Sequence, residues 1–444
     1  MKPSLFQENQ IINKEIKKKN LELLINYYNS FNLSEDNKSK FLEFLLKESR
    51  KNNSFLKISI LIISNMSYQI FDRLIKESFL INKSSVNIHY INYNEFLSLK
   101  KEKLKYDCMF VFFDKNDLEE ISSFSNGLIY TKKDLKKIKD FYNFLFTKLT
   151  ALEKTKIFIS NLSAYENTEF FSLEKKVKNN KSELIDNLNS YILKNSKKYK
   201  FNLLDIESFS KQFGLVNIQD TVKFYLAKIP FSQEFAEFLF PVTVNFALTS
   251  FGKLKKVLVL DLDNTLWGGI LGDEGYENIK IDNETPEGKV FFDFQKTILN
   301  LKKRGVLLAI CSKNFDKNVK AAFKNNTNLV LKYNDFVSIK ANWNNKAENI
   351  KNISKELDLG LDSFVFFDDN PAERELVRSF LPNVTVPELP NEPSYYKNIL
   401  LNSFYFDLAS LSKEDVSRSK SYITNVKREK LKEKFSDFNE YLKS

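Results

Sequence analysis

Two pairs of carboxylates, each placed directly after an apolar run, are the residues of this sequence best suited to chemistry. Asp261 and Asp263 follow the run VLVL, and Asp368 and Asp369 follow the run FVFF. Neither run shows polar alternation, so each predicts a buried parallel strand whose carboxyl end carries the acids. Open α/β sheets bind ligands at that end of their strands. Because neighbouring carboxylates repel each other, the pairs predict a site for a hard cation, although an acid pair alone also fits an Asx-turn.

A hydroxyl group and two ammonium groups lie between these acid pairs in the sequence. Ser312 ends a third apolar run, GVLLAICS, and Lys313 follows it, while Lys346 stands near the start of a helix expected to reach about Leu357. A serine at a strand end can donate a hydrogen bond to a phosphoryl oxygen, and a lysine can place positive charge beside a transferring phosphate. Each residue alone is common at strand ends. The stability of a fold does not by itself explain all four features in this order: acid pair, hydroxyl, lysine, acid pair.

The segments that carry these residues resemble the four motifs of the haloacid dehalogenase (HAD) phosphotransferase superfamily. They read DLDNTLWGG, ICSKN, WNNKAEN and FFDDNPAER in this sequence. The WGG of the first motif and the DDNPAER of the fourth are similar to those of the FkbH-like branch, HAD subfamily IIIC. The likeness covers at least residues 205–420. It implies a Rossmann-like HAD catalytic domain, and the short spacings between the motifs leave no room for a cap domain.

The resemblance implies a role for each site residue. Asp261 is the expected nucleophile, which forms an aspartyl-phosphate intermediate, and Asp263 is the expected acid and base. Mg²⁺ is expected between Asp261 and the backbone carbonyl of Asp263 on one side and the second acid pair on the other. Of that pair, Asp369 is favoured as the direct ligand, with Asp368 close behind. The residues expected to hold the phosphoryl oxygens are Asn264, Thr265, Ser312, Lys313 and Lys346.

Cys311 leaves two interpretations open. It precedes Ser312 in the strand, and neighbouring strand residues face opposite sides, so a small buried hydrophobe is the favoured interpretation. The other is an acyl acceptor that carries a transient glyceryl thioester. FkbH-like proteins are implicated in processing 1,3-bisphosphoglycerate and in loading a glyceryl unit onto an acyl carrier protein. The resemblance therefore implies a phosphorylated three-carbon acid or a carrier-tethered substrate, with an acyl carrier protein as partner.

Two other functions stay open. One is a plain phosphatase in surface-polysaccharide or secondary-metabolite biosynthesis, without acyl transfer. The other is a non-catalytic scaffold, which is disfavoured because all four motifs keep their reactive residues. Formation of a thiol ester would separate the FkbH-like function from the plain phosphatase.

Strand and helix patterns alternate along the chain, which predicts an α/β fold with two parallel-sheet domains. The strands expected upstream of the motifs are 57–63, 86–92, 107–113, 156–160 and about 203–205. The clearest helical patterns are 14–27, 39–48, 67–80, 132–150, 181–195 and 286–304. The expected parts are a helical N-terminal segment, 1–50, an SGNH-hydrolase-like or flavodoxin-like domain, 51–205, a helical connector, 206–250, the HAD-like catalytic domain, 251–400, and a helical C-terminal tail, 401–444.

The domain at 51–205 resembles the SGNH-hydrolase-like domain that precedes the phosphatase domain in FkbH-like proteins. Ser64-Asn65 and Ser160-Asn161 fall at predicted strand ends, where that fold keeps its polar site. An SGNH hydrolase also needs a histidine near the end of the domain, but the single histidine, His89, lies inside a predicted strand. The sequence therefore favours a binding or docking platform over an esterase.

Composition and charge limit the class of protein. The 444 residues are 43% hydrophobic and 28% charged, which is typical of a soluble globular protein. The sequence has no apolar run long enough to span a membrane and no signal-peptide-like start, and two cysteines fit a reducing compartment, so we expect a cytoplasmic protein. The net charge is +11, but lysines are spread along the whole chain. Neither nucleic acid nor membrane is therefore an expected partner.

Overall fold

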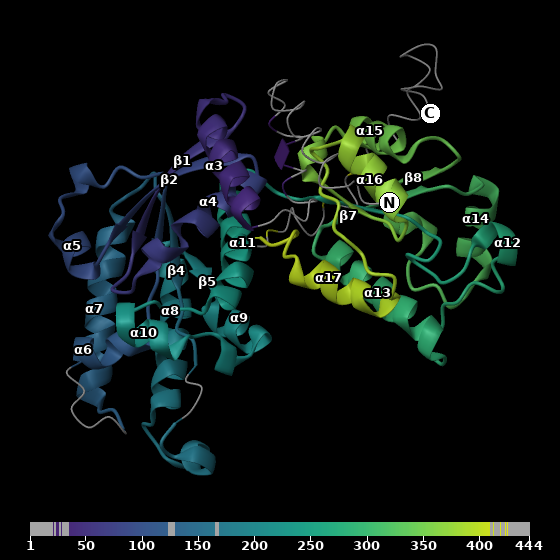
Figure 1. Cartoon of the computed structure of the whole chain (residues 1–444). Helices are drawn as coiled ribbons and strands as arrows, with labels where there is room; N and C mark the ends of the chain where they lie inside the picture. Colours follow the sequence, from purple (N-terminus) through teal and green to yellow (C-terminus); the bar gives the residue numbers. More distant parts are fainter. Residues whose placement is uncertain are drawn as a thin grey trace, which may run out of the picture. The chain divides into compact units, whose positions relative to one another are not determined.

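The computed structural model describes residues 35–122, 129–164 and 168–408, together with residues 21, 24, 25, 28, 412, 418, 422 and 424. The chain folds into two compact units (Figure 1). The N-terminal unit comprises the described residues from 28 to 247, and the C-terminal unit comprises those from 248 onward together with those before 28. The predicted helix at 14–27 lies largely outside the described residues.

Four parallel strands form the sheet of the C-terminal unit, in the order β8-β7-β6-β9. They are β6 (Val257–Leu260), β7 (Leu307–Ser312), β8 (Phe336–Ala341) and β9 (Phe364–Phe367). Every residue of β6, β7 and β9 is buried. These three strands are the apolar runs of the sequence, and their burial is expected for a parallel sheet that is covered on both faces.

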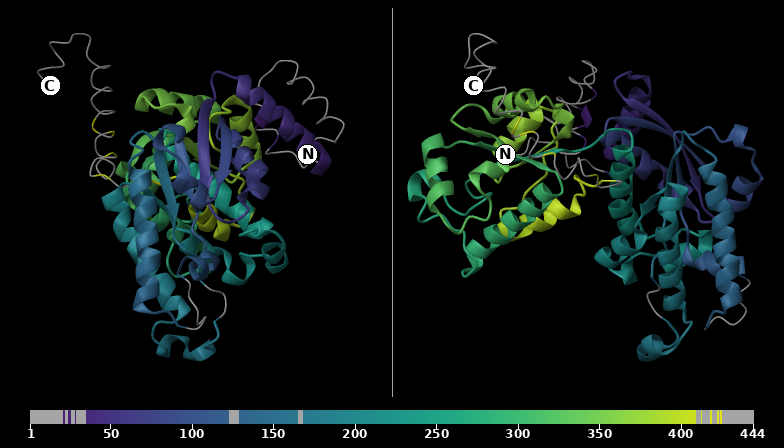
Figure 2. Two further views of the ribbon diagram at one scale, coloured as in Figure 1. Left: turned by 90° about the vertical axis from the view of Figure 1, so that its left-hand side faces the viewer. Right: turned by 180° about the vertical axis from the view of Figure 1, so that it is seen from behind.

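Helices cover both faces of this sheet. They are α12 (Leu271–Glu274), α13 (Pro286–Lys303), α14 (Asp316–Asn325), α15 (Lys346–Leu357), α16 (Pro371–Phe380) and α17 (Tyr396–Asn402). Leu258 and Leu260 of β6 belong to the hydrophobic core formed with α13, α14 and α17, whereas Val257 and Val259 belong to the core formed with α15 and α16. Residues of one strand thus alternate between two cores. The pairs α13–α17 and α15–α16 lie on opposite sides of the strands (Figure 2).

Two of these helices begin inside the motifs because the motifs contain their caps. The side chains of Asn345 and Asn370 each accept a hydrogen bond from the backbone N–H two residues later, at the starts of α15 and α16. Pro371 occupies the first turn of α16, where a missing N–H does no harm. The sequence Asn370-Pro371 alone predicts a helix start, because both residues suit these positions, and the structure confirms it. Lys346, the first residue of α15, is placed by the same device.

Five parallel strands form the sheet of the N-terminal unit, in the order β2-β1-β3-β4-β5. They are β1 (Leu56–Ile63), β2 (Ser84–Ile91), β3 (Cys108–Val111), β4 (Lys156–Ser160) and β5 (Asn202–Leu204). Each overlaps a strand that the sequence predicts. The prediction of an α/β fold with two parallel sheets is therefore confirmed.

Nine described α-helices belong to or begin in the N-terminal unit. They are α3 (Glu35–Lys51), α4 (Asp72–Ile81), α5 (Tyr93–Ser98), α6 (Leu118–Ser122), α7 (Lys132–Thr150), α8 (Lys181–Tyr199), α9 (Ile206–Phe213), α10 (Thr221–Ala227) and α11 (Gln233–Thr249). The helix expected at 67–80 begins instead with a 3-10 turn, Tyr68–Phe71. The expected connector, 206–250, forms α9, α10 and α11. Among the described residues, no helix combines the length and apolarity needed to cross a membrane.

Candidate active site

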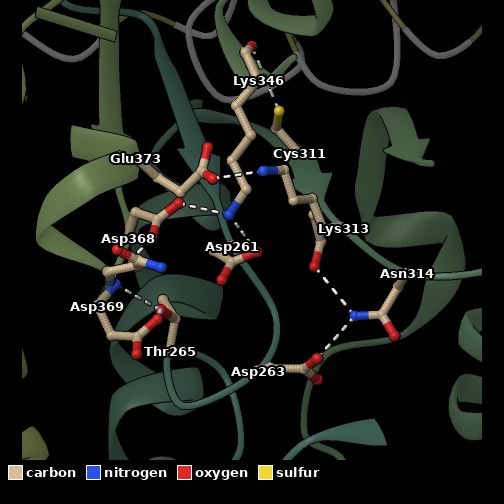
Figure 3. A network of polar contacts seen from close by, with 12 residues as sticks. Asp261, Asp263, Thr265, Cys311, Lys313, Asn314, Lys346, Asp368, Asp369 and Glu373 are labelled. Carbon is tan, nitrogen blue, oxygen red and sulfur yellow. Dashed lines mark hydrogen bonds and ion pairs between the residues drawn. The ribbon is translucent and has the colours of Figure 1, made fainter. Parts of the chain in front are cut away.

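Three carboxylates from two neighbouring strands meet at the carboxyl end of the C-terminal sheet. Asp261 directly follows β6, and Asp368 and Asp369 follow β9, which pairs with β6. Each of the three offers an oxygen, and these oxygens all lie within 4.8 Å of one another. Asp261 and Asp368 are buried, and Asp369 is partly buried. We call these residues the acid cluster (Figure 3).

Lys346 is buried against the acid cluster. Its Nζ lies 2.6 Å from Asp368 Oδ2 and 3.0 Å from Asp261 Oδ1. One ammonium group facing three carboxylates leaves two negative charges unbalanced when all four groups are ionised. In addition, Asp261 Oδ1 is buried and has no hydrogen-bond donor besides the ammonium of this ion pair among the described residues. The residues therefore fit a hard divalent cation, which binds through carboxylate oxygens and would balance the charge.

The pKa values of the cluster show the same excess of negative charge. Burial, together with the charge of Asp261, raises the pKa of Asp368 to about 7 and that of Asp369 to about 6. Burial by itself would lower the pKa of Lys346, but the neighbouring Asp261 and Asp368 raise it above its ordinary value. The lysine therefore stays charged, while the carboxylates lack a sufficient counter-charge.

The Asp263 carboxylate lies outside the acid cluster and is held by three N–H donors. The Trp267 indole Nε1 donates at 3.0 Å, the Leu271 backbone N–H at 3.1 Å and the Asn314 Nδ2 at 2.9 Å. Burial raises the pKa of Asp263, which favours the protonated form needed by a general acid. The three donors fix the position of the carboxylate, and its role in proton transfer stays a prediction. The metal role expected of Asp263, through its backbone carbonyl, stays a prediction as well.

Thr265 and Ser312 present buried hydroxyl groups beside these acids. Thr265 Oγ1 accepts a hydrogen bond from the backbone N–H of Asp369 at 3.1 Å, so it ties the loop after β6 to the end of β9. Ser312 Oγ accepts one from Asn314 Nδ2 at 3.1 Å. The structure therefore brings both predicted phosphate-binding hydroxyls to the edge of the sheet that carries the acid cluster.

Asn264 and Lys313 already have partners within the protein. Asn264 adopts a left-handed backbone conformation, with φ 53°, and its Oδ1 accepts a hydrogen bond from Gly269 N at 2.9 Å. Lys313 Nζ forms an ion pair with Glu373 Oε1 at 2.6 Å. Asn264 thus shapes the turn after β6. Lys313 would have to leave Glu373 to hold a phosphate, so phosphate binding by either residue stays a prediction.

Cys311 faces the core. Its side chain is fully buried and belongs to the core formed with α15 and α16. Burial raises the pKa of the thiol, which disfavours the reactive thiolate. These observations favour the interpretation as a buried hydrophobe over that as an acyl acceptor.

Three further site residues belong to the motifs, although the sequence assigns them no role. Trp267 and Asn314 orient the Asp263 carboxylate. Arg374 is buried, and its guanidinium donates to the backbone carbonyls of Asp368 at 2.8 Å and Asp369 at 2.7 Å. The contacts of Arg374 to backbone carbonyls, of Asn314 to another motif and of Trp267 across its own loop leave no trace in residue spacing, so only the folded chain reveals them.

The N-terminal unit has a polar pocket at the corresponding end of its sheet. Its volume is about 230 Å³, and it is lined by Ile62, Ser64, Asn65, Met66, Ser67, Tyr68, Gln69, Tyr90, Ile91, Asn92 and Glu95. The Ser64 hydroxyl accepts a hydrogen bond from Met66 N at 3.2 Å. His89 lies outside this lining, is exposed on the edge strand β2 and packs against the Tyr106 ring. Ser64 therefore has no histidine partner.

The second polar pair of this unit, Ser160 and Asn161, forms hydrogen bonds that stabilise the fold. Ser160 Oγ accepts a hydrogen bond from Phe113 N at 2.8 Å, which joins β4 to the end of β3. Asn161 Nδ2 donates to Asp205 Oδ1 at 2.7 Å. Both residues are buried. Neither lines the pocket that contains Ser64.

Comparison with known proteins adds a solved structure of a similar chain. The N-terminal part of the protein BF1531 from Bacteroides fragilis, which contains a phosphatase domain complexed with Mg, superposes with a TM-score of 0.73 at 30% identity. The match covers 82% of this chain and 98% of that one. A second structure, the gut microbial diltiazem-metabolizing enzyme BT4096, has a TM-score of only 0.30 at 12% identity and supports no argument.

Two further comparisons bear on the assignment. A scan of protein-family models gives no match to this sequence, and neither does a search of curated proteins. The structural match spans nearly all of the BF1531 fragment. On that match and on the acid cluster at the end of β6 and β9, this chain belongs to the family of the BF1531 N-terminal part, whose catalytic domain has the HAD-like phosphatase fold.

Proposed function

We propose that this chain is a Mg²⁺-dependent phosphatase or phosphotransferase of HAD type. The observation that carries the proposal is the acid cluster with Lys346, in which two negative charges are unbalanced. The phosphatase domain of the related BF1531 fragment was complexed with Mg. Here Asp261, Asp369 and Asp368 would hold the ion, together with the Asp263 backbone carbonyl. The bound ion would neutralise charge on the phosphate.

The chain's own residues supply the steps of the reaction. A carboxylate oxygen of Asp261 attacks phosphorus, and the bond from phosphorus to the leaving oxygen breaks as that oxygen takes the proton of Asp263. In the second step Asp263 accepts a proton from water, whose oxygen attacks phosphorus and frees Asp261 and inorganic phosphate. Lys346 and the hydroxyls of Thr265 and Ser312 hold the phosphoryl oxygens meanwhile.

The two segments where a cap domain could be inserted lie within the described residues and contain only a few elements and no further sheet. Between β6 and β7 the chain forms α12 and α13, and between β7 and β8 it forms α14 and a 3-10 turn, Tyr333–Asp335. An open site of this kind suits a large or tethered substrate. With the motif resemblance, this supports an FkbH-like function: a phosphorylated three-carbon acid such as 1,3-bisphosphoglycerate, and glyceryl transfer to an acyl carrier protein.

A plain phosphatase without acyl transfer is the second candidate. The buried thiol of Cys311, with its raised pKa, favours it because no other described cysteine stands at the site. Under either function, we propose that the N-terminal unit is a docking platform, since Ser64 lacks a histidine partner.

Phosphate release from a generic phosphate ester, with Mg²⁺ and after exhaustive chelation, tests the proposed chemistry. Release that persists without a metal ion would contradict it. The intact masses of the protein and of an acyl carrier protein, after incubation with a glyceryl phosphate donor, separate the two candidates. A glyceryl adduct on the carrier supports the FkbH-like function, and phosphate release without any adduct supports the plain phosphatase.

A further inference from the structure

Three exposed apolar side chains stand in the loops that carry the site. Ile270, Phe315 and Trp343 are 46%, 61% and 62% exposed, and they belong to the loops after β6, β7 and β8 respectively. We call these three residues the apolar rim. Large apolar side chains at this exposure contribute little to a hydrophobic core, so the stability of the fold does not explain them.

Two members of the apolar rim adjoin the residues that hold Asp263. Ile270 directly precedes Leu271, whose backbone N–H donates to the Asp263 carboxylate at 3.1 Å. Phe315 directly follows Asn314, whose Nδ2 donates to the same carboxylate at 2.9 Å. Ile270 and Phe315 are therefore each one residue away from a donor that hydrogen-bonds to the Asp263 carboxylate.

Trp343 adjoins the other side of the site. It follows Asn342, whose backbone N–H donates to the carbonyl of Ser312 at 3.2 Å. The Trp343 and Phe315 rings pack edge to face, with 5.7 Å between centroids and 63° between planes. Two loops thus join to hold a pair of aromatic rings that stays open to solvent. Exposed apolar groups placed beside polar, reactive groups are typical of ligand sites.

We propose that the apolar rim binds the leaving group of the phosphate substrate, and that this leaving group contains an aromatic ring. The inference rests on the proposed function, because Asp263 must lie within hydrogen-bond reach of the leaving oxygen. A group attached to that oxygen extends over the loops whose residues hold Asp263, which are those of Ile270 and Phe315. Aromatic rings bind flat π-systems through offset or edge-to-face contacts, for which a paired Phe315 and Trp343 provide surface.

This inference separates the substrate classes. A bare three-carbon acid has no apolar surface to cover the rim, whereas an aromatic phosphate ester does. The rim therefore favours the plain phosphatase acting on a larger ester.

Steady-state kinetics with benzyl phosphate and ethyl phosphate test the proposal, because the two esters share an alkyl leaving oxygen and differ in the ring. We expect the wild-type chain with Mg²⁺ to have a kcat/KM for benzyl phosphate about tenfold above that for ethyl phosphate. Trp343→Ala and Phe315→Ala should each lower the benzyl value about fivefold, through KM, and change the ethyl value less than twofold. Trp343→Phe should restore most of the benzyl value.

The matched control is Phe380→Ala, which removes a ring that is 69% exposed at the far end of α16. It should change neither value. Equal kcat/KM for the two esters in the wild type, or equal losses on both in the rim variants, would overturn the proposal and leave the phosphatase function standing.

A binding measurement tests the rim even without turnover. Trp343 is exposed and Trp267 is fully buried, so titration with benzylphosphonate should change the tryptophan fluorescence of the wild type at saturation. Ethylphosphonate should require about tenfold higher concentration. Trp343→Phe should remove the change. Absence of any response in the wild type would overturn the role of the rim, whereas hydrolysis of neither ester together with a normal response would contradict only the proposed catalytic function.

Discussion

The two units of this chain share an architecture but place different groups at the same end of their sheets. At the carboxyl ends of β6 and β9, ionisable side chains converge: three carboxylates and a lysine. At the carboxyl ends of β1 and β2, the pocket is lined mainly by hydroxyl and amide groups, with Glu95 as its charged member. A parallel sheet provides the position for a site, and the convergence of charge decides whether the site can transfer a phosphoryl group.

Buried charge is also handled differently in the two units. In the acid cluster, the Lys346 ammonium offsets part of it, and the proposed Mg²⁺ would offset the rest. In the N-terminal unit, Asp117 is buried with Asn65 Nδ2 3.5 Å from its Oδ1, and its Oδ2 accepts no hydrogen bond. Burial, with the charge of Asp114, raises the pKa of Asp117 to about 7. The pKa of Asp117 is thus raised as far as that of Asp368. The two acids differ in their partners, because Asp368 pairs with the Lys346 ammonium whereas Asp117 faces the Asn65 amide.

The largest expected effect tests the nucleophile. Asp261→Asn keeps the shape of the side chain but removes its negative oxygen, so phosphate release should fall at least about a thousandfold. Phosphate release and the urea unfolding midpoint of the same preparation check this. Substantial activity in a folded variant would remove Asp261 from the mechanism and would end the contrast between the two units.

Removal of the metal ion should lower phosphate release almost as much as Asp261→Asn does. Chelation should abolish phosphate release, and restored Mg²⁺ should recover it, while Ca²⁺ should suppress it because its longer, more flexible coordination misplaces the phosphoryl group. Since the ion binds the folded state only, saturating Mg²⁺ should also raise the thermal midpoint of the C-terminal unit. Asp369→Asn is the control variant, which should lose most of that rise. An equal rise in this variant would place the ion elsewhere.

The pH dependence of the free energy of unfolding tests the buried Asp117 of the N-terminal unit. The pKa of Asp117 is raised in the folded chain. Between pH 4 and 7 the folded chain therefore keeps the Asp117 proton, whereas the unfolded chain has released it. The free energy of unfolding should therefore fall as the pH rises through that window, by about 4 kcal/mol at most. Asp117→Asn should remove this loss, measured as the difference between variant and wild type in urea unfolding at several pH values.

A suitable control for that experiment is Asp140→Asn, an exposed carboxylate on α7. It should leave the pH profile unchanged. A profile of Asp117→Asn that runs parallel to that of the wild type would show that Asp117 is ionised in the folded chain.

The smallest expected effect concerns Ser64. If the N-terminal pocket is a docking platform, Ser64→Ala should leave both phosphate release and the hydrolysis of a generic carboxylic ester unchanged within about twofold. The physical reason is that Ser64 has no histidine to remove its proton. A wild-type esterase activity that is lost in Ser64→Ala would revive the hydrolase interpretation and make the two units alike.

The amino-acid sequence determined the elements and the order of the reactive residues. Fully apolar runs such as VLVL specify buried parallel strands because both faces need covering, and Asn370-Pro371 specifies a helix start because both residues suit the first turn. Asp261 and the Asp368–Asp369 pair could be named in advance, since a strand end places its side chains at one edge of the sheet. Lys346 could be named from its place in the third motif, at the start of a helix.

Only the tertiary structure decided how these side chains are used. The ion pair of Lys313 with Glu373 and the donor of Asn314 to Asp263 join segments whose contact depends on strand order and on loop course. The donor of Trp267 to Asp263 lies within one loop and depends on the course of that loop. The aromatic pair of Phe315 and Trp343 depends on the same features. Sequence spacing fixes the direction of a side chain within its own element. Packing between elements fixes its partner, its burial and its pKa, and for that reason the chemistry of this site became definite only in the folded chain.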